Sequence, residues 1–195
     1  MSLRAGDPAF VVPATGGEPR WLPLAGVFSQ PQFSADGAAI TYGIPRGMSG
    51  EVWRYPLAGG KPQMLSVAGS AVHRLSPDGK WIYFARQREP GLFRFPAQGG
   101  APELVLDRVA VELYRGWAVG RDGVYYTVKE EATGKWVIQY YDLATKTHRP
   151  VCRLDLPLPR WTGALSVSRD ERWMVFPLHE PEGSTLSITA AVRLP

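Results

Sequence analysis

Apolar and polar side chains alternate in short runs along most of the chain. Within residues 81–84, Trp81 and Tyr83 would point to one side, and Ile82 and Phe84 to the other. This period of two is typical of a β-strand. No segment combines a helical period of apolar residues with capping residues at its ends. The pattern therefore predicts an all-β protein built from short strands.

A short motif that contains one of these runs recurs four times. Its copies begin at Phe33, Leu75, Val119 and Val167. In the second copy, Pro77 sets the backbone angle of the first corner of a turn, and Gly79 can adopt the left-handed conformation that closes a hairpin. The motif predicts hairpins at 35–37, 77–79, 121–123 and 170–172, with the structural turn residues Asp36, Gly37, Asp78, Gly79, Asp122, Gly123 and Asp170. The fourth copy has Glu171 in place of glycine, so we expect a looser turn or one of another type.

A second motif follows the first and supplies two more strands. It spans Val52 to Leu65 and Leu92 to Val105, with a diverged copy from Ile138 to Val151 and an early copy from Phe10 to Leu22. Pairs of adjacent glycines in these copies predict a second tight turn. Each repeat of about 40–48 residues then holds four strands and two turns, which is the signature of a β-propeller blade.

The two motifs together resemble the WD-repeat-like blades of TolB-type propellers. Their residues in the second repeat are Leu-Ser-Pro-Asp-Gly-Lys-x-Ile-x-Phe, followed by Leu-Phe-Arg-x-Pro-x-x-Gly-Gly-x-Pro. Similar blades occur in the propeller caps of prolyl oligopeptidase-type peptidases and in the C-terminal portion of some bacterial winged-helix regulators. The resemblance covers nearly the whole chain and implies a fold, whereas propellers host many functions. Some copies depart from the pattern: Ala35 and Arg121 stand at the proline position of the first and third copies, and Glu171 stands at the glycine position of the fourth.

The strand count predicts a partial propeller with the shape of an open arc. Residues 1–195 would form one such unit of three complete four-stranded antiparallel blades and two incomplete ones, with blades at 9–23, 32–65, 74–106, 118–152 and 165–192. The alternative is a four-bladed ring, closed by pairing of 20–24 with 186–192. An open arc exposes strand edges at both ends, so we expect self-association through them.

Composition and charge exclude several classes of function. The formal net charge is +4, but residues 1–97 hold 10 Lys and Arg against 6 Asp and Glu, and residues 98–195 hold 12 against 12. Nucleic-acid binding needs clustered cations, so we do not expect it here. No apolar run is long enough to span a membrane. Residues 1–8 lack the apolar core of a signal peptide, which leaves the compartment open: the periplasm, or a position C-terminal to a membrane or cytoplasmic regulator domain.

Candidate catalytic groups do not converge. Because turns and strand ends alternate between the two faces of a propeller, His148 should not meet His73 or His179, which disfavours a three-histidine metal site. No Gly-x-Ser-x-Gly segment marks a nucleophilic serine. The serines beside the hairpins, Ser34, Ser76 and Ser168, should cap local backbone groups, and Cys152 should be a buried, inert thiol. The sequence predicts no enzymatic activity, no cofactor and no metal.

The loops opposite the Asp-Gly turns usually form the binding surface of a propeller. In this chain they hold a near-neutral mixture of charges, which suits protein or peptide contact. Tryptophan and arginine dominate binding hot spots, so the candidate anchors are Arg86, Arg88, Arg115, Trp117, Trp136, Arg160 and Trp161. The alternative for each tryptophan is packing between blades. We therefore expect a non-enzymatic module that binds a protein or peptide, in the C-terminal part of a larger TolB-like or sensor/regulator protein. The alternative is the propeller cap of a prolyl oligopeptidase-type serine peptidase.

Overall fold

The computed structural model describes residues 9–24, 29–47, 49–66, 72–86, 89–109, 116–154, 165–179 and 187–193. These residues form five antiparallel sheets, here called I to V in chain order. Sheet I comprises β1 (Phe10–Val11) and β2 (Arg20–Trp21). Sheet II comprises β3 (Ser29–Phe33), β4 (Ala39–Arg46), β5 (Ser49–Pro56) and β6 (Gln63–Ser66). Sheet III comprises β7 (His73–Leu75), β8 (Trp81–Ala85), β9 (Leu92–Pro96) and β10 (Glu103–Leu106).

Two further sheets complete the described part of the chain. Sheet IV comprises β11 (Trp117–Val119), β12 (Gly123–Lys129), β13 (Trp136–Asp142) and β14 (His148–Leu154). Sheet V comprises β15 (Ser166–Val167), β16 (Trp173–His179) and β17 (Ser187–Arg193). No described residue lies in a helix. Three four-stranded sheets, flanked by one of two strands and one of three, confirm the predicted fold class.

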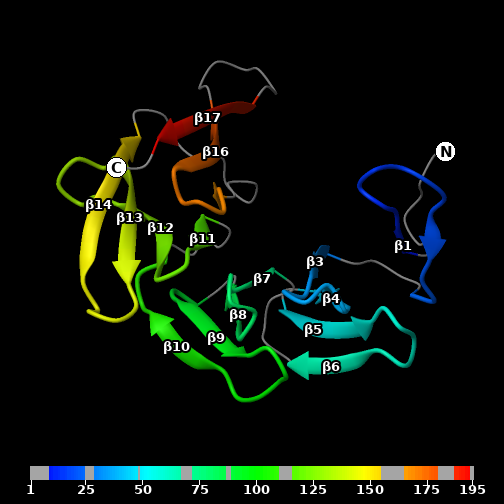
Figure 1. The fold of residues 1–195 in the computed structure, drawn as a ribbon. Coiled ribbons are helices and arrows are strands. Elements are labelled where there is room, and N and C mark those ends of the chain that lie inside the picture. The colour runs from blue at the N-terminus through cyan, green and yellow to red at the C-terminus, as the bar shows by residue number, and fades with distance from the viewer. Residues whose placement is uncertain are drawn as a thin grey trace.

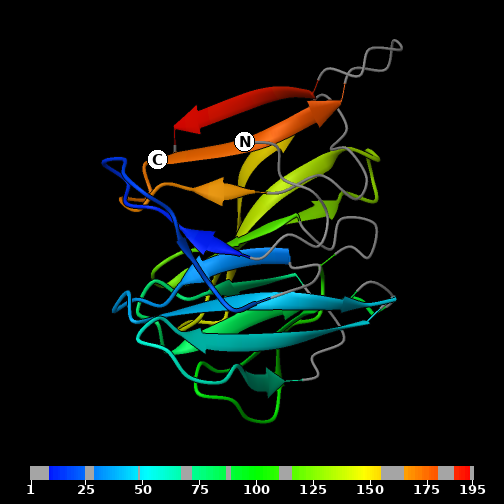
Figure 2. The ribbon, with the colours of Figure 1, turned by 90° about the vertical axis from the view of Figure 1, so that its right-hand side faces the viewer.

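The sheets are arranged as an arc around a common inner side. The first strands of sheets II to V contact one another in succession, β3 with β7, β7 with β11, and β11 with β15. Figure 1 shows β6, β10 and β14 on the outer side, and sheets I and V at the two ends of the arc. From the side, the strands of sheets II and V run across the view at different heights (Figure 2). Among the described residues β2 does not pair with β17, so the arc is open as predicted.

The core consists of four apolar layers, one between each pair of successive sheets. Strand β8 shows how alternation builds two of them. Phe84 and Ile82 pack in the layer between sheets II and III, whereas Tyr83 packs in the layer between sheets III and IV. A strand with apolar residues on both faces is therefore buried on both faces, since it lies between two neighbouring sheets.

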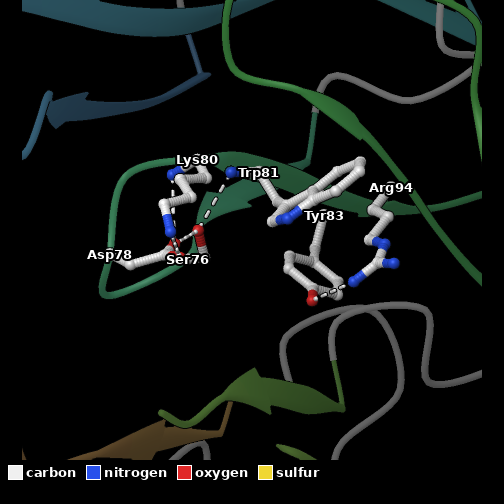
Figure 3. Close-up of polar contacts among 6 residues, drawn as sticks. All are labelled: Ser76, Asp78, Lys80, Trp81, Tyr83 and Arg94. Atoms are coloured by element: carbon white, nitrogen blue, oxygen red, sulfur yellow. Dashed lines mark hydrogen bonds and ion pairs between the residues drawn. The ribbon is translucent and has the colours of Figure 1, made fainter. Parts of the chain in front are cut away.

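The repeated Ser-x-Asp turns share one hydrogen-bond pattern. In sheet III the Ser76 hydroxyl donates to Asp78 Oδ1 at 2.5 Å, and the Lys80 N–H donates to the same carboxylate at 3.0 Å (Figure 3). The Trp81 N–H in turn donates to Ser76 Oγ at 3.0 Å. The same three bonds recur around Ser34 and Ser168. These serines cap the turns as predicted, and each aspartate satisfies a backbone donor.

The turn of sheet IV is shorter than predicted, and Gly123 does not belong to it. Gly120 replaces the serine, and its N–H donates to the Gly123 carbonyl at 2.8 Å, which leaves only Arg121 and Asp122 between the strands. Gly123 begins β12 with no left-handed φ, so its predicted role was wrong. A Cβ at Gly123 would lie 2.3 Å from Tyr140 Cζ and 2.4 Å from the Tyr141 carbonyl oxygen. Close approach, rather than turn geometry, requires glycine here.

The turn of sheet V keeps the common pattern, contrary to the expectation of a looser turn. Glu171 adopts the left-handed conformation with φ 55° in place of glycine. Its carboxylate accepts the Arg121 N–H at 2.6 Å and the Tyr125 hydroxyl at 3.2 Å, both from sheet IV. Bonds between sheets thus offset the strain of a non-glycine residue in this region. Burial, and then the charge of Glu171, raise the pKa of Tyr125.

Candidate partner-binding face

Four of the seven predicted anchors, Arg88, Arg115, Arg160 and Trp161, lie outside the described residues. Trp117 is fully buried in the layer between sheets III and IV, so its prediction as an exposed anchor is corrected to the packing alternative. The Arg74 guanidinium lies 5.8 Å from its ring centroid. Trp136 is half-buried and packs against the layer between sheets IV and V. Both tryptophans contact a neighbouring sheet, because their side chains face the apolar layers between successive sheets.

Arg86 lies on the predicted face, at the end of β8. Its guanidinium forms an ion pair with Glu89 and lies 4.3 Å from the centroid of the Phe93 ring. The side chain is half-buried, and its charge already has an acidic and an aromatic neighbour. A ligand that used Arg86 would have to compete with both.

A cleft of about 690 Å³ opens on the same face, between the end of sheet III and one side of sheet IV. Val137 and Gln139 of β13 line it, while the alternate residues Trp136 and Ile138 face the layer between sheets IV and V. The lining as a whole comprises Arg108, Val128, Lys129, Glu130, Glu131, Val137, Gln139, Pro150 and Arg153. The cleft thus combines a short apolar floor with three cations and two anions.

The charges in the cleft are partly organised by contacts within the chain. Glu130 accepts hydrogen bonds from the Thr133 hydroxyl at 2.6 Å and from Arg153 Nη2 at 3.2 Å. The Thr133 bond, and then the Arg153 bond, hold the pKa of Glu130 below its usual range. Arg108 lies 3.5 Å from the Asp107 carboxylate. Exposed pairs of this kind exchange partners at little cost, which suits a polar binding surface.

The lining of the cleft combines two carboxylates with three cations. Its nine residues include no serine, cysteine or histidine. Across the described part of the chain, no group of three or more His, Cys, Asp or Glu could hold a metal ion. Nor does that part contain a helix able to cross a bilayer.

The other candidate groups serve the packing of the sheets. His73 is fully buried, and its Nε2 lies 3.1 Å from Thr41 Oγ1 of sheet II. His148 Nδ1 lies 2.8 Å from the Tyr126 hydroxyl. Cys152 is half-buried rather than buried, because it lies at the margin of the layer between sheets IV and V, where its Sγ donates to the Arg153 carbonyl at 3.4 Å.

Sequence reasoning missed the residues that line the cleft. Arg108, Lys129, Glu130 and Arg153 lie in or beside the expected loops, but the preference for tryptophan and arginine in hot spots favoured other positions. The available signal was the dense run of charges from Lys129 to Lys135 after an apolar strand. A run of this kind is usually a solvated turn, so the signal is weak without the neighbouring sheet.

The proteins that this chain is similar to identify its fold alone. No family model matches the chain, and no curated protein matches it. Among solved structures, TolB from Acinetobacter baumannii aligns with a TM-score of 0.65 at 15% identity, over 95% of this chain and 48% of that one. A chain of the nidogen/laminin complex aligns with a TM-score of 0.61 at 16% identity, over 83% of this chain and 61% of that one.

A third similar structure is the β-propeller domain of the Trilobed protease from Pyrococcus furiosus, which has an open velcro topology. It aligns with a TM-score of 0.52 at 14% identity, over 84% of this chain and 53% of that one. The chain therefore has a TolB-like β-propeller fold, and it spans roughly half the length of the solved propellers that it resembles.

Proposed function

We propose that this propeller segment is a non-enzymatic module that binds a protein or peptide through the cleft between sheets III and IV. The observation that carries the proposal is the mixed lining of that cleft, with Val128 and Val137 at its floor and charges of both signs at its rim. Apolar contact surrounded by exchangeable ion pairs is the usual anatomy of a protein interface. The propeller seen in the nidogen/laminin complex supports the same class of function.

We place this module in a larger TolB-like or sensor/regulator protein. Support comes from the length of the similar propellers, of which this chain spans 48% in the case of TolB. The partner would then be recognised by the arc, and any further activity would reside elsewhere in such a protein.

The test is selection of displayed peptides on the immobilised chain, followed by charge reversal in the cleft. We expect K129E to weaken the selected peptides about three- to tenfold, since rim charges contribute modestly to affinity. The matched control is K61E, because Lys61 lies in the turn between β5 and β6, outside the cleft. Peptides that bind both variants equally well would place the site elsewhere.

A second candidate is the propeller domain of a serine protease. The similarity to the propeller of the Trilobed protease favours it. In that case the chemistry would lie in a separate catalytic domain, and the purified chain would hydrolyse no peptide or ester above background. A Gly-x-Ser-x-Gly segment in the flanking open reading frame would favour the protease, and a winged-helix or periplasmic leader segment would favour the binding module.

A further inference from the structure

A second hollow, of about 270 Å³, lies beside the cleft between sheets III and IV. Tyr141 of β13 and His148 of β14 line it. Gln139 and Pro150, each two positions away on the same strands, line the cleft. Residues two positions apart in a strand point to the same side and lie about 7 Å apart. The two hollows therefore open on one face of sheet IV, and together they are called the outer groove here.

The outer groove runs along the outer side of the arc, between β10 of sheet III and β14 of sheet IV (Figure 1). Its wall on sheet III is continuous, since Asp107 lines the second hollow and the next residue, Arg108, lines the cleft. On sheet IV, the hydroxyl of the fully buried Tyr126 donates to Gln139 Oε1 at 2.7 Å and lies 2.8 Å from His148 Nδ1. One buried side chain thus holds a residue of each hollow in place.

A lysine stands at each end of the outer groove. Lys129 lines the cleft and pairs with Trp136, the first residue of β13. Lys146 lines the second hollow and lies in the turn after Asp142, the last residue of β13. Six positions separate Trp136 from Asp142, which corresponds to about 20 Å along a strand. The two lysines are therefore about as far apart as residues 1 and 7 of an extended peptide.

The backbone of Lys146 is strained. Its φ of 60° lies in the left-handed region, which glycine adopts freely and other residues adopt at a cost. Its Nζ lies 5.8 Å from the centroid of the Tyr141 ring, which lines the same hollow. Strained residues of this kind concentrate at ligand sites. The conformation is thus a second observation, besides the hollow itself, that points to Lys146 as a ligand contact.

Between the two lysines the outer groove offers apolar surface to a ligand. Leu104 of β10 is 57% exposed and lines the second hollow. Pro150 is exposed and lines the cleft. Met64 holds the position of Leu104 in sheet II, because each of the two lies in a fourth strand and pairs with an aromatic residue of the third. Met64 lies outside the outer groove, so it provides a matched comparison.

The charges of the lining complement an acidic ligand. Four Lys and Arg and three Asp and Glu line the outer groove. Two of the three acids already have a cation from the chain. Arg153 donates to Glu130 at 3.2 Å, and Arg108 lies 3.5 Å from Asp107. Within the described part of the chain, neither of the two lysines forms an ion pair.

We propose that the outer groove binds an extended segment of a partner protein with the pattern acidic-x-apolar-x-apolar-x-acidic. Alternate side chains of an extended segment face the same side, so positions 1, 3, 5 and 7 face the groove together. The acids at the two ends pair with Lys129 and Lys146, and the apolar residues pack on Pro150 and Leu104. The proposal rests on the cleft as a peptide site, and it adds the length and the pattern of the peptide.

The probe is the peptide Glu-Ser-Val-Thr-Val-Ser-Glu with capped termini, labelled with fluorescein through an added glycine. Its seven residues read the same in both directions, so the result does not depend on the orientation of binding. We expect saturable binding to the full chain, measured by fluorescence anisotropy. A peptide with lysine in place of both glutamates should bind at least about tenfold more weakly, since it reverses both charges.

Variants at the end that the cleft does not include test the extension of the site. K146E and L104D should each weaken the probe about three- to tenfold, since the first reverses a charge and the second removes an apolar contact. K146G should weaken binding to a similar extent without lowering the melting temperature, because glycine relieves the strain. The matched controls K61E and M64D alter the turn and the fourth strand of sheet II, and both should bind as the wild type does.

An exchange of charge separates direct contact from a structural effect. A probe with lysine at one end and glutamate at the other should bind K146E more tightly than the probe with two glutamates does. Equal or weaker binding of the exchanged probe would overturn the contact at Lys146. Circular dichroism of each variant separates loss of binding from loss of fold.

The outcomes distinguish this proposal from the proposed function. Absence of saturable binding, or equal binding by K146E, L104D and the wild type, would overturn the pattern. If displayed peptides still lose affinity in K129E, the cleft remains a peptide site and only its extension to Lys146 fails. If K129E leaves those peptides unaffected as well, the proposed function fails with it.

Discussion

Three aspartates at equivalent turns accept a hydroxyl and a backbone N–H each, and this fixes how they respond to acid. The hydrogen bond from the neighbouring serine is the main cause that lowers the pKa of Asp36, Asp78 and Asp170 below the ordinary value of 3.8. A carboxyl group whose pKa is lower in the folded than in the unfolded chain contributes stability that is fully present above the unfolded value. That contribution is lost as the pH falls through the folded value.

We therefore expect the melting temperature to fall as the pH drops below about 4, in part through these turns. The variant D78N keeps an acceptor oxygen but cannot ionise, so its melting temperature should be lower than that of the wild type at about pH 6. The difference between the two should shrink as the pH falls below the ordinary carboxyl value of 3.8, because Asp78 becomes protonated. Thermal melts followed by circular dichroism measure this, and parallel curves over the whole range would contradict it.

At the scale of strands and turns, glycines of one motif act through two different mechanisms. Gly37 needs its left-handed φ of 68°, and a Cβ there would meet nothing within 4 Å. Gly123 needs space, because Tyr140 and the Tyr141 carbonyl occupy the place of a Cβ. Adding a Cβ should therefore cost a different amount of stability at the two positions. At Gly37 the cost is local backbone strain, whereas at Gly123 a clash with the neighbouring strand displaces packed atoms.

We predict that G123A lowers the free energy of unfolding by about 2–3 kcal/mol, as overpacking does elsewhere. The matched substitution G37A should cost about 1 kcal/mol from backbone strain alone. Urea denaturation of the two variants and the wild type measures both values. Equal losses, or a larger loss in G37A, would be inconsistent with a clash at Gly123.

Most of the fold could be predicted from the sequence because each strand pairs with a neighbour along the chain. Alternation locates the strands, and the glycines locate the turns. The exceptions depend on contacts between sheets. Glu171 can replace glycine because a shortened turn in sheet IV presents the Arg121 N–H to it. For Trp117 the residue type left a surface anchor and packing between blades both open, and only the neighbouring sheet shows that it is buried. The cleft likewise needs two sheets to exist.

At the scale of the whole molecule, the two ends of the arc differ. The end at sheet I holds an apolar groove, whereas the end at sheet V exposes the large apolar side chains of Trp173 and Val175. Val175 occupies the position in its strand that Tyr83 occupies in sheet III, and Tyr83 is buried against the following sheet. Among the described residues β17 pairs only with β16, so this end also has an unpaired strand edge. Both features favour pairing with another chain.

We expect the isolated chain to self-associate through sheet V as its concentration rises. The double variant W173E/V175E should shift the association to concentrations at least about tenfold higher, because it places charges on the contact face. Sedimentation velocity over a range of concentrations measures the shift. F33D, which alters an exposed residue of sheet II, serves as the control, and a wild-type chain that stays monomeric at high concentration would contradict the prediction.

The open arc also bears on how the chain reaches its fold. Within every described sheet the strands follow one another in sequence order. A ring closed by pairing its two ends would have to bring segments on the order of 170 residues apart together, at a loop-closure entropy of about 4–5 kcal/mol. The arc avoids this step, so each sheet can form from local contacts and then dock on its neighbour. We therefore expect folding to start in the middle sheets, each of which packs against two neighbouring sheets. The end sheets pack against only one neighbour, so we expect them to open first.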